Sequence, residues 1–179
     1  MSIYDQIIKK LQDNNILFRE VKHEPEGRCD VISEIRGNKL SQAMKAIVIK
    51  AKITKKQRKY YLVVVPGDRL LDMEAIKEFA RTRSTMFAQK EKAEELTQCE
   101  MGAVPPFTFN KDLTLIVDPS IKLNEEIVFN AGRLDRSIFM KTSDYLKIAD
   151  PDFVNIAKND PVTSKKDDSA TLKEKAPIY

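Results

Sequence analysis

Two consecutive apolar segments, residues 44–52 and 60–65, constrain the fold more than any other part of the sequence. In the first segment the side chains alternate, so that Lys45 and Ile47 face one way and Met44 and Val48 the other. The second segment is almost continuously apolar and is followed directly by a Pro-Gly pair. A short run of this kind is typical of a central strand that is covered on both faces. We therefore expect a β-hairpin whose second strand is buried within a sheet.

Helical and strand-like segments surround this hairpin. Apolar residues three and four apart predict helices, and short β-branched or alternating runs predict strands. Gly37 is placed to end one helix, and Asp72 is placed to cap the start of another. The predicted helices are 3–11, 30–35, 73–80, 89–96 and one from 143, and the other strands are 16–21, 85–88, 113–117, 127–130 and 137–140. This order predicts an α+β fold with a mixed, largely antiparallel, β-barrel-like sheet flanked by helices.

Length and composition restrict the classes of protein that fit. The chain has 179 residues and a net charge of +4, which permits contact with a polyanion but does not require it. We expect one domain over residues 1–157 and a polar, flexible tail over 158–179. Two cysteines and a single histidine, His23, match no zinc pattern, so we expect no metal and no cofactor. With neither a signal-like N-terminus nor a membrane-length apolar run, we expect a cytoplasmic protein without membrane contact.

The segment 101–107 is predicted to be a rigid loop. Pro105 and Pro106 lack backbone donors and fix φ, while Gly102 permits conformations and close approaches that other residues do not. Taken alone, the segment is more simply interpreted as a plain connector between a helix and a strand. It becomes more informative beside two other segments, Ser41 to Val48 and Phe129 to Ile138.

In their order and spacing, these three segments together resemble the YbaK/ProX family of aminoacyl-tRNA deacylase domains, which also occur inserted in some bacterial prolyl-tRNA synthetases. The resemblance implies hydrolysis of the ester that joins a wrong, small amino acid such as Ala, Cys or Ser to a non-cognate tRNA, classically the tRNA for proline. It also implies that tRNA, through its acceptor end, is a partner, and that an aminoacyl-tRNA synthetase is a further candidate partner.

The resemblance assigns candidate site residues. The family's lysine falls on Lys45 and its loop glycine on Gly102, and we expect these two residues, assisted by Asn130, to act on the ester. A loop glycine can present backbone N–H groups to the carbonyl, where a preorganised donor contributes about 10²–10³ in rate. We expect the remaining substrate contacts at His23, Ala46, Ala103, Val104, Pro105, Gly132, Arg133, Asp135 and Ser137.

Two positions depart from the family pattern and leave the amino-acid specificity open. Ala46 stands where Thr or Asn often follows the lysine, and Asp135 lies in a region where related sequences frequently carry a histidine. A basic cluster offers phosphate contacts to tRNA, although it also fits a solvated turn. It consists of Lys52, Lys55, Lys56, Arg58 and Lys59. Two alternatives remain: a non-catalytic module that binds tRNA or an amino acid, and a domain that acts only when docked on a synthetase.

Overall fold

The computed structural model describes residues 1–158. The expected C-terminal tail therefore lies, except for Lys158, outside the described residues. The helices are α1 (Ile3–Asp13), α2 (Cys29–Arg36), α3 (Met73–Phe79), α4 (Lys90–Thr97) and α5 (Thr142–Ala149), with 3-10 turns η1 (Leu40–Gln42) and η2 (Pro119–Leu123). The strands are β1 (Phe18–Lys22), β2 (Met44–Lys52), β3 (Arg58–Pro66), β4 (Thr85–Phe87), β5 (Leu113–Val117), β6 (Glu126–Asn130), β7 (Arg136–Lys141) and β8 (Asp152–Phe153).

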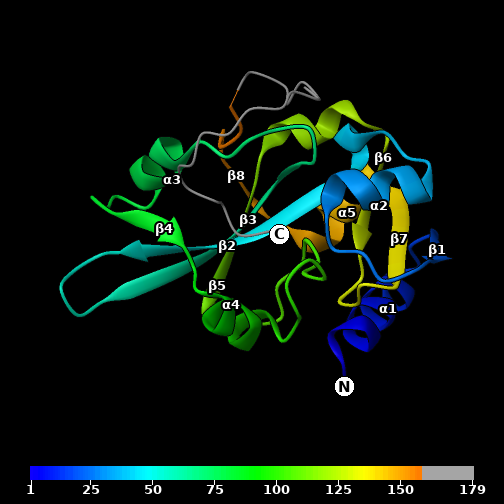
Figure 1. Ribbon diagram of the computed structural model, residues 1–179, viewed down its shortest axis with the longest axis horizontal. Helices are drawn as coiled ribbons and strands as arrows, with labels where there is room; N and C mark the ends of the chain where they lie inside the picture. The colour runs from blue at the N-terminus through cyan, green and yellow to red at the C-terminus, as the bar shows by residue number, and fades with distance from the viewer. Residues whose placement is uncertain (159–179) are drawn as a thin grey trace, which may run out of the picture.

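The strands form two sheets, which lie on the left and right of the molecule in Figure 1. The larger sheet has the order β4-β2-β3-β5-β8 and the smaller one the order β1-β7-β6. Strand pairs β3–β5 and β5–β8 are parallel, and all other pairs are antiparallel. The mixed, largely antiparallel α+β architecture is thus confirmed. The strands do not close into a barrel within residues 1–158, where an isolated bridge between Ala43 and Val128 links the two sheets.

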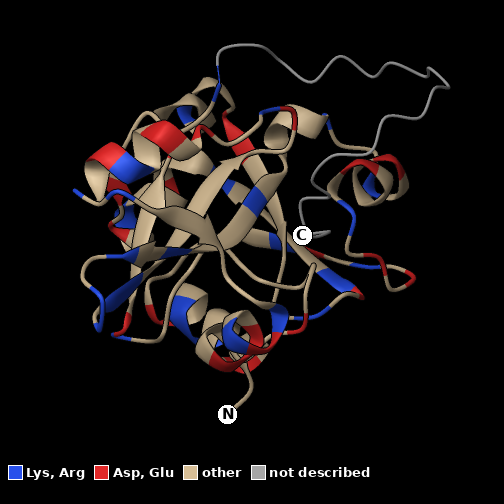
Figure 2. Ribbon diagram, turned by 60° about the vertical axis from the view of Figure 1, so that its left-hand side comes forward, with Lys and Arg blue, Asp and Glu red and all other residues tan. Residues whose placement is uncertain are grey.

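The predicted hairpin is present, with Met44 opposite Pro66 at one end and Lys52 opposite Arg58 at the other. Strand β3 lies between β2 and β5 and is buried over most of its length, as its sequence predicted. Alternation along β2 places one row of side chains in a core with α1, β6 and α5, and the other row in a second core with α3. Charged residues gather on the outer helices and loops, and the strands that cross the middle are largely uncharged (Figure 2).

The helix ends follow the local sequence. Gly37 ends α2 in the left-handed conformation, with φ of 72°, and the Asp72 carboxylate accepts the N–H groups of Glu74 and Ala75 at the start of α3. The end of α2 and the start of β2 are joined by a short connection that contains η1. This connection brings the face of α2 against the β2 end that carries Lys45, and that junction forms one side of the candidate site.

Candidate active site

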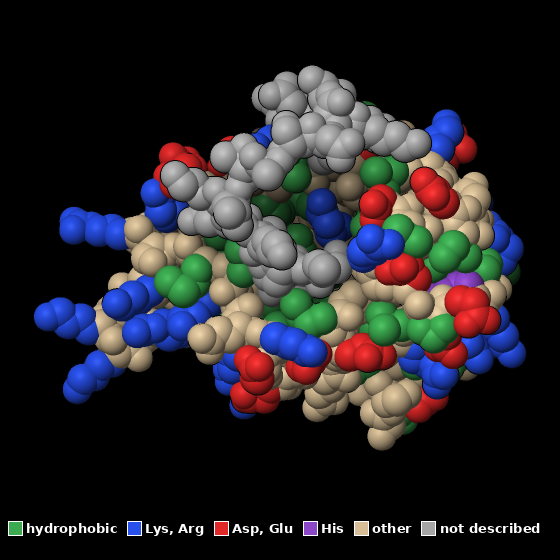
Figure 3. Space-filling model, in the orientation of Figure 1, with side chains coloured by type: hydrophobic (Ala, Val, Ile, Leu, Met, Phe, Trp, Pro, Cys, Tyr) green, Lys and Arg blue, Asp and Glu red, His purple; other side chains and the backbone are tan. Residues whose placement is uncertain are grey.

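A cavity of about 30 Å³ lies where four segments far apart in the sequence converge. They are α2 with the residues just before it, the start of β2, the loop that contains Gly102, and the end of β6. The lining residues are Gly27, Cys29, Ile32, Arg36, Ala43, Met44, Lys45, Ala46, Gly102, Val104, Val128, Phe129 and Asn130. Figure 3 shows a face that is hollowed near its centre, where a Lys or Arg side chain lies among hydrophobic side chains. Five of the predicted residues are therefore brought together: Lys45, Ala46, Gly102, Val104 and Asn130.

Gly102 packs backbone against backbone with Gly27. Its φ is +88°, and a Cβ added there would lie 2.5 Å from the Gly27 Cα atom. A Cβ added at Gly27 would in turn lie 3.1 Å from the Gly102 Cα atom. Both positions therefore require glycine, Gly102 for its backbone angle as well as for space. Gly27 was not among the predicted site residues.

The carbonyl groups of the Gly102 loop are held on three sides. Asn130 Nδ2 donates to the Gly102 carbonyl at 2.9 Å, the Gly132 N–H donates to the Ala103 carbonyl at 3.0 Å, and the Tyr145 hydroxyl donates to the Pro106 carbonyl at 2.7 Å.

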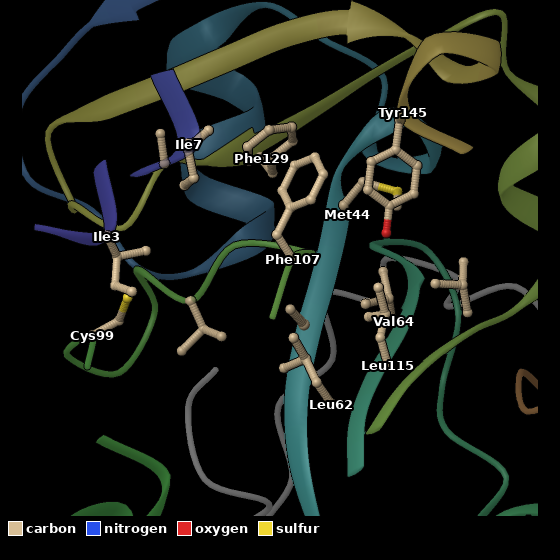
Figure 4. Packing of buried hydrophobic residues seen from close by; sticks show 14 of the residues in the cluster. Ile3, Ile7, Met44, Leu62, Val64, Cys99, Phe107, Leu115, Phe129 and Tyr145 are labelled. Atoms are coloured by element: carbon tan, nitrogen blue, oxygen red, sulfur yellow. The ribbon is translucent and has the colours of Figure 1, made fainter. Parts of the chain in front are cut away.

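Aromatic packing fixes the end of this loop. Phe107 lies between Phe129 and Tyr145, with edge-to-face ring centroids 5.6 and 5.1 Å apart (Figure 4). Two prolines with fixed φ precede Phe107, so the loop has little freedom left. Ala103 and Pro105 are buried within the loop and do not line the cavity.

Two backbone donors of this loop remain unused. Within the described part of the chain, the N–H groups of Gly102 and Val104 donate no hydrogen bond, whereas the intervening Ala103 N–H donates to the Glu100 carbonyl. Val104 is only 7% exposed, and a buried N–H without a partner costs about 1–3 kcal/mol. Both residues line the cavity.

Lys45 contributes a positive charge to the cavity wall. Its Nζ donates to the Arg69 carbonyl at 2.7 Å, and it forms no ion pair within residues 1–158. Burial lowers the pKa of the Lys45 ammonium, and the nearby Cys29 and Asp68 oppose part of that shift. The ammonium retains two further N–H donors, because a lysine carries three.

Asn130 forms the centre of a hydrogen-bond network behind the cavity wall. Its Nδ2 donates to the carbonyls of Gly102 and Glu26, and its Oδ1 accepts from the Ser137 hydroxyl at 3.0 Å. Ser137 is fully buried and does not line the cavity; its Oγ also contacts His23 Nε2 at 2.7 Å. Ser137 and His23 therefore lie behind Asn130, which ties the Gly102 loop to the segment before α2.

Arg36 is a cavity residue that sequence reasoning missed. Its Nη1 donates to Ser137 Oγ at 3.0 Å and to Asn130 Oδ1 at 3.4 Å. The available signal was the spacing of Cys29, Ile32 and Arg36, which places all three on one face of α2. This signal does not show which face of the helix meets a cavity.

The predicted residues of the β6–β7 connection lie elsewhere. Arg133 and Asp135 pair with each other at 2.8 Å, and Asp135 also pairs with Arg136 at 2.7 Å. Hydrogen bonding to Arg133 lowers the pKa of Asp135 to about 2. Neither residue lines the cavity. Gly132 contributes through its N–H bond to the loop, and an added Cβ there would lie 2.9 Å from Ile3 on α1.

The predicted basic cluster occupies the turn of the β2–β3 hairpin and the strand ends beside it. The hairpin turn lies on the left in Figure 1, and Lys and Arg side chains project from this edge of the molecule in Figure 3. Arg58 donates to the carbonyls of Thr54, Lys55 and Gln57 and so stiffens the turn.

No group of three or more His, Cys, Asp or Glu side chains in residues 1–158 could hold a metal ion. In the same residues, no helix has the length and apolar character needed to cross a membrane.

Comparisons with known proteins agree with this arrangement. The family model for the aminoacyl-tRNA editing domain matches residues 23–148. The chain is 37% identical over 150 residues to the multifunctional Ser/Thr-tRNA deacylase ProXp-y of Escherichia coli (strain K12), covering 83% of this chain and 89% of that protein. It is 23% identical over 116 residues to a proline–tRNA ligase of Methylobacillus flagellatus, of which it covers 20%.

Solved structures share the fold. The hypothetical protein APE2540 superposes with a TM-score of 0.75 at 18% identity, over 86% of this chain and 99% of that one. A protein described as a candidate trans-editing enzyme for prolyl tRNA synthetase superposes with a TM-score of 0.72 at 17% identity, over 89% and 99% of the two chains. With the family model spanning α2, β2, the Gly102 loop and β6, the chain belongs to the aminoacyl-tRNA editing domain family.

Proposed function

We propose that this protein hydrolyses the ester of seryl- or threonyl-tRNA in which the amino acid is attached to the wrong tRNA. Family membership makes the chain an editing hydrolase of the deacylase class. The choice of serine and threonine is supported by the name of the E. coli relative, which spans nearly the same length. The family resemblance implied alanine, cysteine or serine, and serine is the one that the name of the E. coli relative also contains. Alanine and cysteine therefore serve as test substrates.

The observation that carries the proposal is that Gly102 and Val104, whose N–H groups have no partner among the described residues, line the same cavity as Lys45. Attack by water on the ester carbonyl forms a tetrahedral intermediate with negative charge on the former carbonyl oxygen. Two fixed N–H donors can stabilise this charge without reorganising, and a single donor of this kind contributes about 10²–10³ in rate. The bond to the ribose oxygen then breaks, and that oxygen takes up a proton. Lys45 supplies positive charge next to these steps.

The size of the cavity supports a small acyl group. The cavity is small, about 30 Å³, which supports an acyl group with a short side chain such as that of serine or threonine. Val128, Phe129 and Ile32 line the cavity and are themselves buried, so they limit the room for a longer side chain. A small cavity suits an editing site. The binding pocket of a synthetase distinguishes amino acids that differ by one methylene group by only about 1–3 kcal/mol, so a separate site that admits only small amino acids is needed to remove the errors.

The assignment extends to the partner. In this proposal residues 1–157 form the editing domain. The basic turn of the hairpin contacts the phosphates of the tRNA, and the reaction takes place in the cytoplasm. The similarity to part of a proline–tRNA ligase supports a synthetase as a second partner. Asn130 acts in this proposal by fixing the Gly102 carbonyl, and His23 and Ser137 act by fixing Asn130.

The test is a panel of tRNAs carrying serine, threonine, alanine or cysteine, with release of the amino acid measured over time. We expect hydrolysis of the seryl and threonyl esters, and a loss of at least about 100-fold in Lys45→Ala. Circular dichroism and thermal unfolding of the variant check that its fold is retained. If the wild-type protein binds these tRNAs but leaves every ester intact while a control deacylase cleaves them, the protein is a binding module and the proposal is wrong.

A further inference from the structure

Arg36 is a half-buried cation whose hydrogen-bond partners within residues 1–158 are neutral oxygens. Its Nε donates to Asn38 Oδ1 at 3.0 Å, and its Nη1 donates to Ser137 Oγ and Asn130 Oδ1. In the described part of the chain, no carboxylate lies within ion-pair distance of it. Burial lowers the pKa of the guanidinium to about 10. A partly buried charge without a counter-charge carries a desolvation cost, so the position of Arg36 at the cavity calls for an explanation.

Two donors of this guanidinium are left over. An arginine carries five N–H groups; one on Nε and two on Nη1 are used, and Nη2 donates to no described residue. Arg36 also lines the cavity, at the end of the α2 face that carries Cys29 and Ile32. The three bonds on one side fix the plane of the guanidinium, so that the free donors keep a defined position.

The cavity decides what kind of acceptor these donors can meet. In the proposed function the acyl side chain of the substrate enters this small cavity, and its hydroxyl is the acceptor that the substrate brings to Arg36. The amide of Asn130 cannot replace Arg36 in this role, because both of its polar atoms already have partners. Lys45 is assigned to the ester in the proposed function, and the other residues that line the cavity are largely apolar. Arg36 is therefore the lining residue left to bind a hydroxyl.

From this geometry we infer that Arg36 is the specificity-determining residue of the site, and that it donates to the side-chain hydroxyl of a seryl or threonyl group. The inference rests on the proposed function and adds a chemical reason for its substrate class. A site built to hydrogen-bond a hydroxyl discriminates against an analogue that lacks it, because the buried donor then stays unpaired. Alanine, which fits by size, is rejected for this reason.

The experiment compares three esters on one tRNA, carrying serine, threonine or alanine, so that only the side chain differs. We expect the wild-type protein to hydrolyse the seryl and threonyl esters at least about 10-fold faster than the alanyl ester, as a hydrogen bond to a charged group contributes about 1.5–3 kcal/mol. In Arg36→Met the ratio of the seryl or threonyl rate to the alanyl rate should fall to about 1. In Arg36→Lys, which retains a charged donor, this ratio should be partly restored. Single-turnover rates at saturating protein measure the ratio directly.

Ser137→Ala is the matched variant, because it removes one partner of Arg36 behind the wall while the bonds to Asn38 and Asn130 still hold the guanidinium. It should slow all three esters by a similar factor and keep the preference. Equal loss on all three esters in Arg36→Met would assign Arg36 a structural role and overturn the inference. A wild-type protein that cleaves the alanyl ester as fast as the seryl ester overturns it without any variant. Failure of the wild type on every ester instead overturns the proposed function together with it.

Discussion

Two glycines, Gly27 and Gly102, determine how closely the two loops at the cavity approach each other. Gly102→Ala would place a Cβ 2.5 Å from the Gly27 Cα atom at a φ of +88°, so that the loops must separate. We expect a loss of about 2–4 kcal/mol in the free energy of unfolding, from the clash together with the backbone strain. Hydrolysis should fall by at least about 100-fold, because the N–H groups leave their positions. Denaturant unfolding and deacylation rates measure the two effects.

Gly37→Ala provides the control for backbone strain alone. Gly37 has a similar φ of +72°, but an added Cβ would meet no atom within 4 Å. This variant should lose about 1 kcal/mol of stability and keep hydrolysis close to that of the wild type. If the two variants lose activity to the same extent, the contact between Gly102 and Gly27 does not hold the site together.

Asn130 can be tested by a change that leaves its shape almost unaltered. Asn130→Asp replaces an amide that donates to the carbonyls of Gly102 and Glu26 by a carboxylate that faces two acceptors. We expect a loss of about 2–4 kcal/mol in the free energy of unfolding, since two bonds are lost and a buried charge is added. Asn14→Asp, on the exposed end of α1, is the control and should change stability by less than about 1 kcal/mol. Similar stability for the two variants would show that the Asn130 contacts are weak.

The sequence pointed to part of this site and missed the rest for a physical reason. Lys45, Gly102 and Asn130 were selected through the family resemblance, and their segments do meet at one cavity. Arg36 and Gly27 have no local signature, because their roles come from contacts with residues 75 to 101 positions away in the chain. Only the packing of α2 against β6 and β7 creates these contacts.

Among the structural elements, the connection between β6 and β7 carries a pH-dependent contribution to stability. Its Asp135 is held between Arg133 and Arg136, and the pKa of that carboxyl falls from 3.8 to about 2 in the folded protein. A carboxylate with a lowered folded-state pKa stabilises the fold above its unfolded pKa and loses that contribution as the pH falls toward 2. The stability difference between the wild type and Asp135→Asn should therefore be constant above about pH 5 and shrink below pH 4.

Urea unfolding between pH 2.5 and pH 7 measures this difference. Asp13→Asn on α1 is the control, since that carboxylate pairs with Lys9 on the exposed helix surface. A pH-independent difference for Asp135→Asn would mean that the arginine contacts do not lower its pKa.

The elements themselves were predictable where the pattern was local. Strands 44–52 and 113–117 match β2 and β5 to the residue, because apolar runs there end at clear turn residues. The strand β8 was not predicted: its two exposed residues have no apolar pattern and are defined by pairing with β5. The division into two sheets was missed for the same reason, since pairing between distant strands such as β1 and β7 is decided by tertiary packing.

At the scale of the whole molecule, the β2–β3 hairpin places the proposed sites of ester hydrolysis and of tRNA binding at its two opposite ends. Lys45 lies at the cavity end of β2, and Lys52 lies seven residues further on, a distance of about 23 Å at the usual rise of a strand. A tRNA whose acceptor end enters the cavity would therefore meet the basic turn with phosphates well away from the ester. Affinity for tRNA and hydrolysis of the ester should then be separable by mutation.

The double variant Lys55→Gln and Lys56→Gln tests this separation. It removes two positive charges at the hairpin turn, so that tRNA binding should weaken and the slope of log affinity against log salt should become shallower by about 1–2. Single-turnover hydrolysis at saturating protein should stay within about 2-fold of the wild type, because the cavity is unchanged. Lys9→Gln with Lys10→Gln on α1 makes the same change in net charge elsewhere and should leave the slope unaltered. Equal slopes for the two double variants would show that overall charge, and not the hairpin, attracts the tRNA.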